Sequence, residues 1–295
     1  VRKGNMTTLV EDGKEIATGK YNISAVFSPD SQKLAVLVND GKNAARVIID
    51  GVSGKTYDYV SDLLFSPDSK RFAYIARTQN KKIVVLDGQE NEIQEDKLYE
   101  TNASGLTFSP DSKQFAYVAG TYRNSYVVLD GERLNKDKKF GSVRALVFSP
   151  DSKQFAYSAE IVNTLLVSST FERYLVVNGE VRELPYKELY DRVYIPVFSS
   201  DGTKIAYRLQ KGNRELVVVN GVEGKDYDKA WDSIFSPDGK HVAYVAQQAH
   251  QYFVVVDGAE GKHYINIQSS YVPSVLDQRY DLLFSPDSKK YAYLA

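Results

Sequence analysis

The phrase Phe-Ser-Pro-Asp, followed by Ser or Gly, recurs throughout this chain of 295 residues. Its copies begin at Phe27, Phe65, Phe108, Phe148, Phe235 and Phe284, and a variant copy at Phe198 reads Phe-Ser-Ser-Asp-Gly. Successive copies lie 37 to 50 residues apart. A period of about forty residues is typical of repeat proteins, in which each supersecondary unit buries its apolar face against its neighbours. The phrase therefore constrains the fold more tightly than the function.

A single repeat, residues 62–99, predicts four short strands. Residues 62–65 form an apolar run that ends at the turn sequence Ser66-Pro67-Asp68-Ser69. Residues 70–76 suit a second strand, and residues 83–86 a third, which ends at the tight-turn pair Asp87-Gly88. A weaker amphipathic stretch to Tyr99 supplies the fourth strand. Four antiparallel strands in about forty residues make one blade of a β-propeller.

The two ends of the chain carry complementary halves of a repeat. The chain opens with a third-strand phrase, residues 9–13, and closes with the Phe284 phrase and the strand residues 291–293. We therefore predict an all-β, seven-bladed β-propeller with four antiparallel strands per blade, formed as a single domain over residues 1–295. Residues 5–22 and 281–295 would share the last blade, which closes the ring and hides two sheet edges. Because the chain begins at Val1, we also expect that an upstream segment has been removed.

Composition excludes several classes of function. A net charge of −1 gives no general attraction to nucleic acid, and no run of 18 apolar residues favours membrane insertion. Without Cys, neither disulfides nor thiolate metal sites can form. The three His residues do not fall in a catalytic pattern, and the seven turn Asp residues have a structural explanation. We expect no catalytic residue, no metal site and no cofactor, and hence a protein that is not an enzyme.

Phe-Ser-Pro-Asp-Ser/Gly-Lys followed by Ala-Tyr resembles the Pro-Asp variant of the WD-type repeat. This variant is found in TolB-like β-propellers and in the propeller domains of some serine peptidases. The resemblance covers about residues 5–295. It implies that the strand ending in Phe-Ser-Pro-Asp is innermost in each blade and lines a central channel. It also implies a bacterial protein of the periplasm, cell envelope or extracellular space, while the sequence leaves a cytoplasmic location open.

Binding is expected on one face of the predicted propeller. The Ser-Pro-Asp and Asp-Gly turns share one face, and the connections after the second and fourth strands share the other, which we call the loop face. Variable loops on a rigid scaffold commonly carry function. The candidate partner-binding residues there are Tyr57, Asp58, Arg77, Tyr122, Arg123, Tyr190, Arg208, Tyr227, Trp231 and Asp232. The alternative is that each Tyr seals a blade boundary and each acidic residue caps a turn.

The leading interpretation is a non-catalytic, monomeric scaffold that recognises a protein or peptide on the loop face. A carbohydrate-binding module is an alternative, because aromatic and Arg/Asp side chains also suit glycans. A lyase or hydrolase with its site at the channel mouth is a further alternative. Two repeats exceed the basic length, near residues 160–173 and 265–278. These insertions would form either contact sites or simply longer strands.

Overall fold

The computed structural model describes residues 2–3, 6–41, 44–79, 81–92, 102–121, 124–164, 169–183, 192–271 and 278–295. The chain forms two compact units, Val1–Lys139 and Phe140–Ala295. The described residues form strands and turns, and none of them forms a helix that could cross a membrane. Tyr122, Arg123 and Tyr190 lie outside the described residues.

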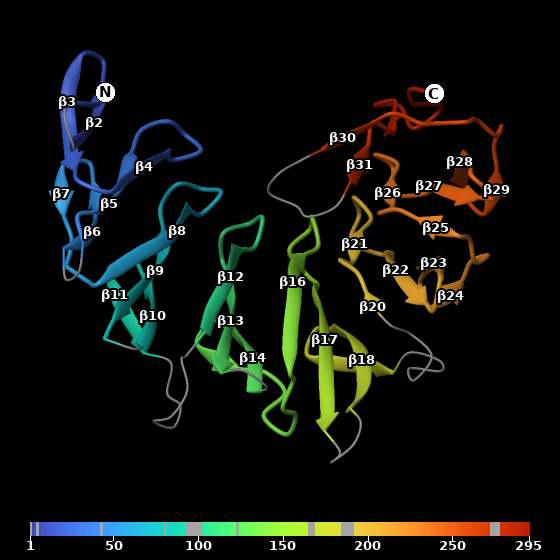
Figure 1. The fold of residues 1–295 in the computed structure, drawn as a ribbon, viewed down its shortest axis with the longest axis horizontal. Coiled ribbons are helices and arrows are strands. Elements are labelled where there is room, and N and C mark those ends of the chain that lie inside the picture. The colour runs from blue at the N-terminus through green and yellow to red at the C-terminus, as the bar shows by residue number, and fades with distance from the viewer. Residues whose placement is uncertain are drawn as a thin grey trace. The chain divides into compact units, whose positions relative to one another are not determined.

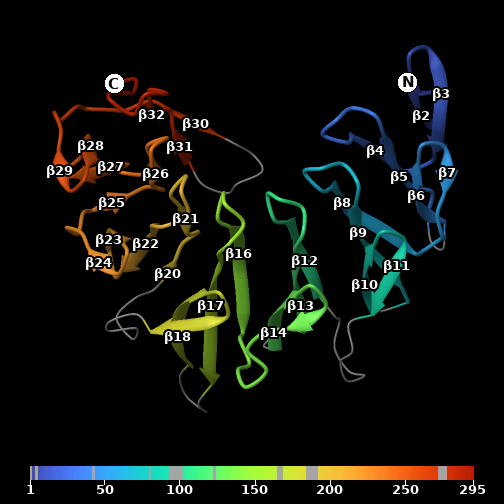
Figure 2. The ribbon, with the colours of Figure 1, turned by 180° about the vertical axis from the view of Figure 1, so that it is seen from behind.

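The first unit contains one three-stranded and three four-stranded antiparallel sheets (Figures 1 and 2). Its strands are β1 (Arg2–Lys3), β2 (Met6–Glu11), β3 (Lys14–Gly19), β4 (Asn22–Phe27), β5 (Leu34–Asn39), β6 (Ala45–Ile49), β7 (Val52–Ser53), β8 (Tyr59–Phe65), β9 (Phe72–Thr78), β10 (Lys81–Leu86), β11 (Gln89–Glu92), β12 (Asn102–Phe108), β13 (Phe115–Thr121), β14 (Asn124–Leu129) and β15 (Glu132–Arg133). The sheets follow chain order as β1–β3, β4–β7, β8–β11 and β12–β15.

The second unit continues the same pattern. Its strands are β16 (Ser142–Phe148), β17 (Phe155–Thr164), β18 (Ser169–Val177), β19 (Glu180–Glu183), β20 (Arg192–Val193), β21 (Val197–Phe198), β22 (Ile205–Lys211), β23 (Arg214–Val219), β24 (Val222–Glu223), β25 (Lys229–Ala230), β26 (Ile234–Phe235), β27 (Val242–Gln248), β28 (Gln251–Val256), β29 (Ala259–Glu260), β30 (Ser269–Tyr271), β31 (Gln278–Tyr280), β32 (Leu283–Phe284) and β33 (Tyr291–Ala292). β20 and β21 both pair with β22, and β25 and β26 both pair with β27, so each pair stands where other sheets have one first strand.

Asp-Gly and Asn-Gly pairs join the last two strands of each sheet that has four or five strands. Asp87 and Gly88 have φ values of 53° and 80°, the two positive values that a type I′ turn requires. The Asp87 side chain also accepts a hydrogen bond from the Phe72 backbone N–H at 2.9 Å. At the equivalent turn, the side-chain amide oxygen of Asn220 accepts a hydrogen bond from the Ile205 backbone N–H at 2.9 Å. One side-chain acceptor oxygen is sufficient for this role, which explains why either Asp or Asn can precede Gly at these turns.

The Ser-Pro-Asp turns link neighbouring sheets. Ser66 donates its hydroxyl hydrogen to Asp68 at 2.7 Å, and its Oγ accepts a hydrogen bond from the Arg71 N–H at 3.0 Å. Ser69, at φ 62°, accepts a hydrogen bond from the Asp30 N–H of the preceding turn at 3.0 Å. The same link joins the Asp68 N–H to Ser112 and the Asp238 N–H to Ser288, each at 2.9 Å. These three hydrogen bonds each tie a turn to the turn of the neighbouring repeat.

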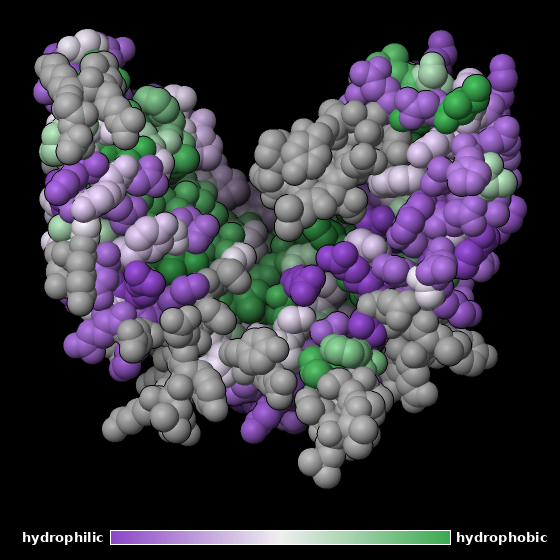
Figure 3. Space-filling view, viewed as in Figure 1, coloured by the Kyte–Doolittle hydropathy of each residue, from purple (hydrophilic) through white to green (hydrophobic). Residues whose placement is uncertain are grey.

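The hydrophobic core lies between the faces of successive sheets. One cluster joins Val47 of β6 to Tyr74 of β9, and another joins Ile75 of β9 to Tyr117 of β13. In the second unit, Leu175 of β18 packs with Leu209 of β22 in the same way. Figure 3 shows mainly hydrophilic residues on the side of β22–β29 that is turned to the viewer. Apolar residues are therefore concentrated between the sheets.

Successive four-stranded meanders that pack face to face have the arrangement of propeller blades. The predicted all-β class is confirmed, and four of the described sheets have the predicted four antiparallel strands. The number of seven blades, the single domain and closure by both termini stay predictions. The longer repeat near residues 160–173 extends β17 and β18, which pair from Ala156↔Val177 to Thr164↔Ser169. Strand lengthening, one of the two alternatives, therefore describes this insertion.

Candidate functional site

The first strand of five successive sheets is irregular at one shared register position, whereas β4 pairs with β5 without a shift. β8, β12 and β16 each shift register there, next to Asp62, Gly105 and Ala145, which all have positive φ. In the following two sheets the strand is interrupted instead, by residues 194–196 and 231–233. Bulges and interruptions of this kind redirect side chains away from the ladder and are common beside functional sites. In the second unit they place Arg144, Tyr194 and Trp231 at equivalent positions.

The residue opposite this position on the second strand differs in two adjacent repeats. Arg144 pairs with Ser158, and the Tyr194 N–H donates to the Arg208 carbonyl at 3.0 Å. The corresponding residues of β9, β13 and β27 are Ile75, Val118 and Val245, all apolar. The change from an apolar residue to Ser158 and Arg208 was readable in the sequence and would have indicated this part of the chain.

Arg208 is a buried cation with several partners. Only 4% of it is exposed, and its Nη1 lies 3.2 Å from Glu215 Oε2 and 2.7 Å from the Ala230 carbonyl oxygen. Its Nη2 lies 3.5 Å from Asp232 Oδ1, and its guanidinium carbon lies 3.5 Å from the centre of the Tyr194 ring. Glu215, 2% exposed, also accepts a hydrogen bond from the Ala230 N–H at 3.0 Å. The network therefore joins the sheet of β22 and β23 to that of β25.

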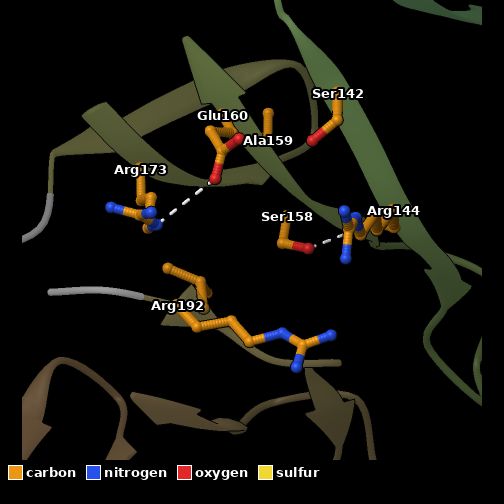
Figure 4. Close-up of a pocket in the computed structure, with 8 residues that line it drawn as sticks. Ser142, Arg144, Ser158, Ala159, Glu160, Arg173 and Arg192 are labelled. Atoms are coloured by element: carbon orange, nitrogen blue, oxygen red, sulfur yellow. Dashed lines mark hydrogen bonds and ion pairs between the residues drawn. The ribbon is translucent and has the colours of Figure 1, made fainter. Parts of the chain in front are cut away.

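A pocket opens beside this network, between the β16–β19 sheet and β20 (Figure 4). Its volume is about 240 Å³, and its lining residues are Ser142, Arg144, Ser158, Ala159, Glu160, Arg173, Arg192 and Val193. The lining contributes three guanidinium groups, one carboxylate and two hydroxyls. Ser142 and Arg144 lie at the start of β16, and Arg192 and Val193 form β20. The other lining residues lie within β17 and β18, towards the connection between these two strands. They thus belong to the loop face, defined by the connections after the second and fourth strands.

The cations of the pocket differ in their partners. Arg173 Nε lies 3.3 Å from Glu160 Oε2, and the two residues face each other across β17 and β18. Arg192 has its guanidinium carbon 4.8 Å from the centre of the Tyr194 ring, a cation–π contact. Among the described residues, neither Arg144 nor Arg192 forms an ion pair. The pocket therefore has a surplus of positive charge.

A second, more apolar cavity lies in the first unit. It has a volume of about 630 Å³ and is lined by Val47, Ile49, Val52, Ser53, Gly54, Lys55, Tyr57, Phe72, Tyr74, Gly88 and Glu90. At its rim Glu90 accepts hydrogen bonds from Lys55 at 2.6 Å and from the Tyr57 hydroxyl at 2.8 Å. The hydrogen bonds from Lys55 and Tyr57 lower the pKa of Glu90, while burial raises that of Tyr57.

This rim recurs elsewhere in the fold. In the second unit, Glu260 accepts hydrogen bonds from Lys225 at 2.7 Å and from the Tyr227 hydroxyl at 3.1 Å. Tyr57 and Tyr227 are 3% and 1% exposed, and each packs edge-on against the Tyr of its Ala-Tyr strand, Tyr74 or Tyr244. A repeated, buried arrangement favours the alternative in which these Tyr residues seal blade boundaries.

The other described candidates fall into two places. Asp58 and Arg77 lie in the first unit, where the Asp58 N–H donates to the Arg77 carbonyl at 2.8 Å. Arg208, Trp231 and Asp232 lie together in the second unit, and Trp231 stacks on Tyr252 at 5.9 Å between ring centres. The residues of the pocket itself, Arg144, Glu160, Arg173 and Arg192, were not among the candidates. They come from four different strands, so no local sequence pattern brings them together. Within the described ranges, no group of three His, Asp or Glu residues is placed to hold a metal ion.

Comparison with known proteins places this chain by fold only. No protein-family model matches it, and no curated protein sequence matches it. Among solved structures, a eukaryotic initiation factor is 14% identical with a TM-score of 0.50, covering 92% of this chain and 69% of that one. The Dos1 propeller is also 14% identical, with a TM-score of 0.49 and coverage of 92% and 74%. TolB from Acinetobacter baumannii is 19% identical with a TM-score of 0.33, covering 81% of this chain. This chain spans 62% of the length of that TolB.

The structural matches correct one expectation. They include an oligogalacturonate lyase, at 13% identity and a TM-score of 0.43, and dipeptidyl peptidase 4 from Porphyromonas gingivalis, at 11% and 0.48. The expectation that this chain is not an enzyme is therefore wrong as a deduction from its fold and its few His residues, because enzymes are among the proteins with similar structures. At these identities the similarity concerns the fold and assigns no reaction to this chain.

Proposed function

We propose that this chain binds a protein or peptide partner on its loop face, at the pocket between β16–β18 and β20. The observation that carries the proposal is the presence of two guanidinium groups, on Arg144 and Arg192, that form no ion pair with any described residue. Both side chains are exposed and line a concave site. Arg is enriched at protein interfaces, and a concave pocket with such an anchor suits partner recognition.

The size of the pocket favours a peptide over a larger small molecule. Small-molecule sites usually enclose about 300–1,000 Å³, whereas this pocket encloses about 240 Å³. A single side chain of a partner would fill such a volume. Trp231, the aromatic candidate for a glycan platform, stacks on Tyr252 within the protein. The geometry therefore supports peptide recognition more strongly than a carbohydrate platform.

Selection from a library of random twelve-residue peptides displayed on phage tests the proposal. We expect enriched peptides that bind the immobilised protein and lose about tenfold or more in affinity on Arg192→Ala, because one charge-assisted contact is removed. Lys113→Ala is the matched control, since Lys113 is an exposed cation of a Ser-Pro-Asp turn on the opposite predicted face. Failure to enrich any peptide, or equal binding to both variants, contradicts the proposal. A glycan array on the same protein would reveal the carbohydrate alternative.

We also propose that the blades close into a seven-bladed ring. β1–β3 and β32–β33 are separate sheets of three and two strands, and large apolar side chains are exposed in both regions, on Met6, Val10, Leu283, Tyr291 and Leu294. In complete sheets, the Ala of Ala-Tyr pairs with the residue before the Asp-Gly turn, as in Ala73↔Leu86, Ala116↔Leu129 and Ala243↔Val256. The same register would pair Ala292 with Glu11. Ala292 is exposed, whereas Ala73, Ala116 and Ala243 are fully buried, which supports a missing partner strand.

We further propose that the protein belongs with the Pro-Asp variant of WD-type propellers and acts in the bacterial cell envelope. The repeated Phe-Ser-Pro-Asp and Ala-Tyr phrases support the first part. The second part rests on the resemblance to TolB-like propellers. Fractionation of the source cells, followed by immunodetection of this chain, tests the location; recovery in the cytosol alone would contradict it.

A further inference from the structure

The pocket of the second unit combines cations from three strands that are remote in sequence. Arg144 lies on β16, Arg173 on β18 and Arg192 on β20, and Glu160 is the one anion among the described residues of the lining. In Figure 4, Glu160 is directed towards Arg173, while Arg192 extends beneath Ser158 towards the side where Arg144 lies. The lining therefore holds one internal ion pair and two further guanidiniums.

We propose that the pocket recognises a carboxylate, carried by a Glu or Asp side chain of the partner, through Arg144 and Arg192. This inference rests on the proposed function and names the chemistry of the group that is bound. A guanidinium presents N–H donors in a planar fork that matches a carboxylate, and such charge-assisted bonds are stronger than neutral ones. The two hydroxyls of the lining, on Ser142 and Ser158, add polar groups at the same site.

The Glu160–Arg173 pair shows that the pocket already accommodates one carboxylate. This pair is partly shielded from solvent, with 27% of the Glu160 side chain and 14% of the Arg173 side chain exposed. Glu160 neutralises Arg173 and leaves Arg144 and Arg192 for the ligand. The contact with the Tyr194 ring, which also packs against Arg208, restricts Arg192 before the ligand binds. Such pre-organisation lowers the conformational entropy that binding costs.

Glu160 lowers the net charge of the described lining from three positive charges to two. A phosphate carries a charge of about −1.5 to −2 at neutral pH, so it meets both more attraction from the guanidiniums and more repulsion from Glu160 than a carboxylate does, and the phosphoserine peptide below distinguishes the two groups. A single carboxylate can accept hydrogen bonds from both guanidiniums through its two oxygens. A cationic side chain would meet a net excess of two positive charges in the lining, which follows from three Arg and one Glu. An acidic peptide is therefore the expected occupant.

Three capped pentapeptides that differ only at the central residue test the inference. The central residue is Glu, Gln or phosphoserine, and the readout is the side-chain Nε–H resonances of Arg144 and Arg192 in a ¹H–¹⁵N spectrum of the full chain. We expect the Glu peptide to shift both resonances in a saturable manner and the Gln peptide to bind at least tenfold more weakly. Raising the salt concentration should weaken the Glu peptide, since the site is exposed.

The double variant Arg144→Gln/Arg192→Gln should bind the Glu peptide about a hundredfold more weakly, as two charge-assisted contacts are lost. Arg182→Gln is the matched control, because Arg182 is an exposed Arg of β19 outside the pocket and its loss should leave binding unchanged. Equal binding of the Glu and Gln peptides, stronger binding of the phosphoserine peptide, or full binding by the double variant would overturn the inference.

The outcomes distinguish the two proposals. If library-selected peptides bind but the Glu peptide does not, partner binding stands and the carboxylate inference falls. If neither a library peptide nor the Glu peptide binds, the proposed partner-binding function falls and the carboxylate inference falls with it.

Discussion

Single side-chain oxygens organise the turns of this protein. Each Asp of the Ser-Pro-Asp turns accepts a hydrogen bond from the hydroxyl of the Ser two residues before it, at 2.5 to 2.7 Å in all seven repeats. The same oxygen accepts a hydrogen bond from the backbone N–H two residues later, as in Thr203 N–H to Asp201 at 3.0 Å. These hydrogen bonds favour the ionised carboxylate. The structural role that the sequence suggested for these Asp residues agrees with this geometry.

Stability should depend on these carboxylates in acid. The hydrogen bonds from Ser199 and from the Thr203 N–H lower the pKa of Asp201 to about 2, below its value of about 3.9 in an unfolded chain. A lowered pKa stabilises the folded state fully above about pH 4, and this contribution is lost as the pH falls towards 2. We expect the difference in urea-unfolding free energy between wild type and Asp201→Asn to shrink over that range. Asp137→Asn, outside the repeated turns, is the control, and a difference independent of pH would contradict the expectation.

At the scale of strands and sheets, the register shift in the first strand of a sheet places side chains such as Arg144 at the pocket. The strands and both turn types could be predicted, because Pro, Asp-Gly pairs and β-branched runs each have local conformational preferences. The bulge at Ala145 could not, since Ala has no preference for the φ of 60° that it adopts. Arg144 and Arg192 line the same pocket through the packing of two sheets, which no local pattern encodes. Tyr57 and Tyr227 were binding candidates but are buried. In the sequence, an aromatic residue next to an acidic one has the same pattern whether it binds a partner or packs in the core.

The Arg208 network should be a structural element between two sheets. Arg208→Met leaves Glu215 buried with only Lys229, at 3.2 Å, as a charged partner, and removing one member of a buried ion pair typically costs about 3–5 kcal/mol. We expect a loss near the lower end of that range in urea unfolding. The double variant Arg208→Met/Glu215→Leu should recover much of it, less about 1 kcal/mol for the orphaned Ala230 N–H. A single variant as stable as wild type would show that Arg208 is not needed for packing.

At the scale of the whole molecule, the number of blades depends on the chain ends. β1–β3 has three strands and β32–β33 has two, fewer than the four or five strands of the complete sheets. The registers of the complete sheets specify how these two incomplete sheets would join. Closure of the ring therefore predicts that Glu11 and Ala292 pair across adjacent strands.

A disulfide tests that pairing directly, because the chain has no native Cys. Glu11→Cys/Ala292→Cys should oxidise to an intramolecular disulfide, seen as faster migration on a non-reducing gel. The control Val10→Cys/Ala292→Cys should not, since a shift of one residue moves a side chain to the other face of the sheet. Deleting residues 1–20 should lower the thermal midpoint by roughly 10 °C or more, given 2–4 °C per kcal/mol for a chain of this size. Absence of the first disulfide together with an unchanged midpoint would contradict closure.

The hydrogen bonds between successive Ser-Pro-Asp turns have a consequence for how such a chain can change. Asp68 donates to the repeat that follows, through Ser112, while Ser69 accepts from the repeat that precedes, through Asp30. The turn of residues 66–69 thus donates one hydrogen bond to the next turn and accepts one from the preceding turn. A duplicated copy of this repeat would carry both the donor N–H and the acceptor Ser hydroxyl, so it would form the same hydrogen bonds with the turns on either side.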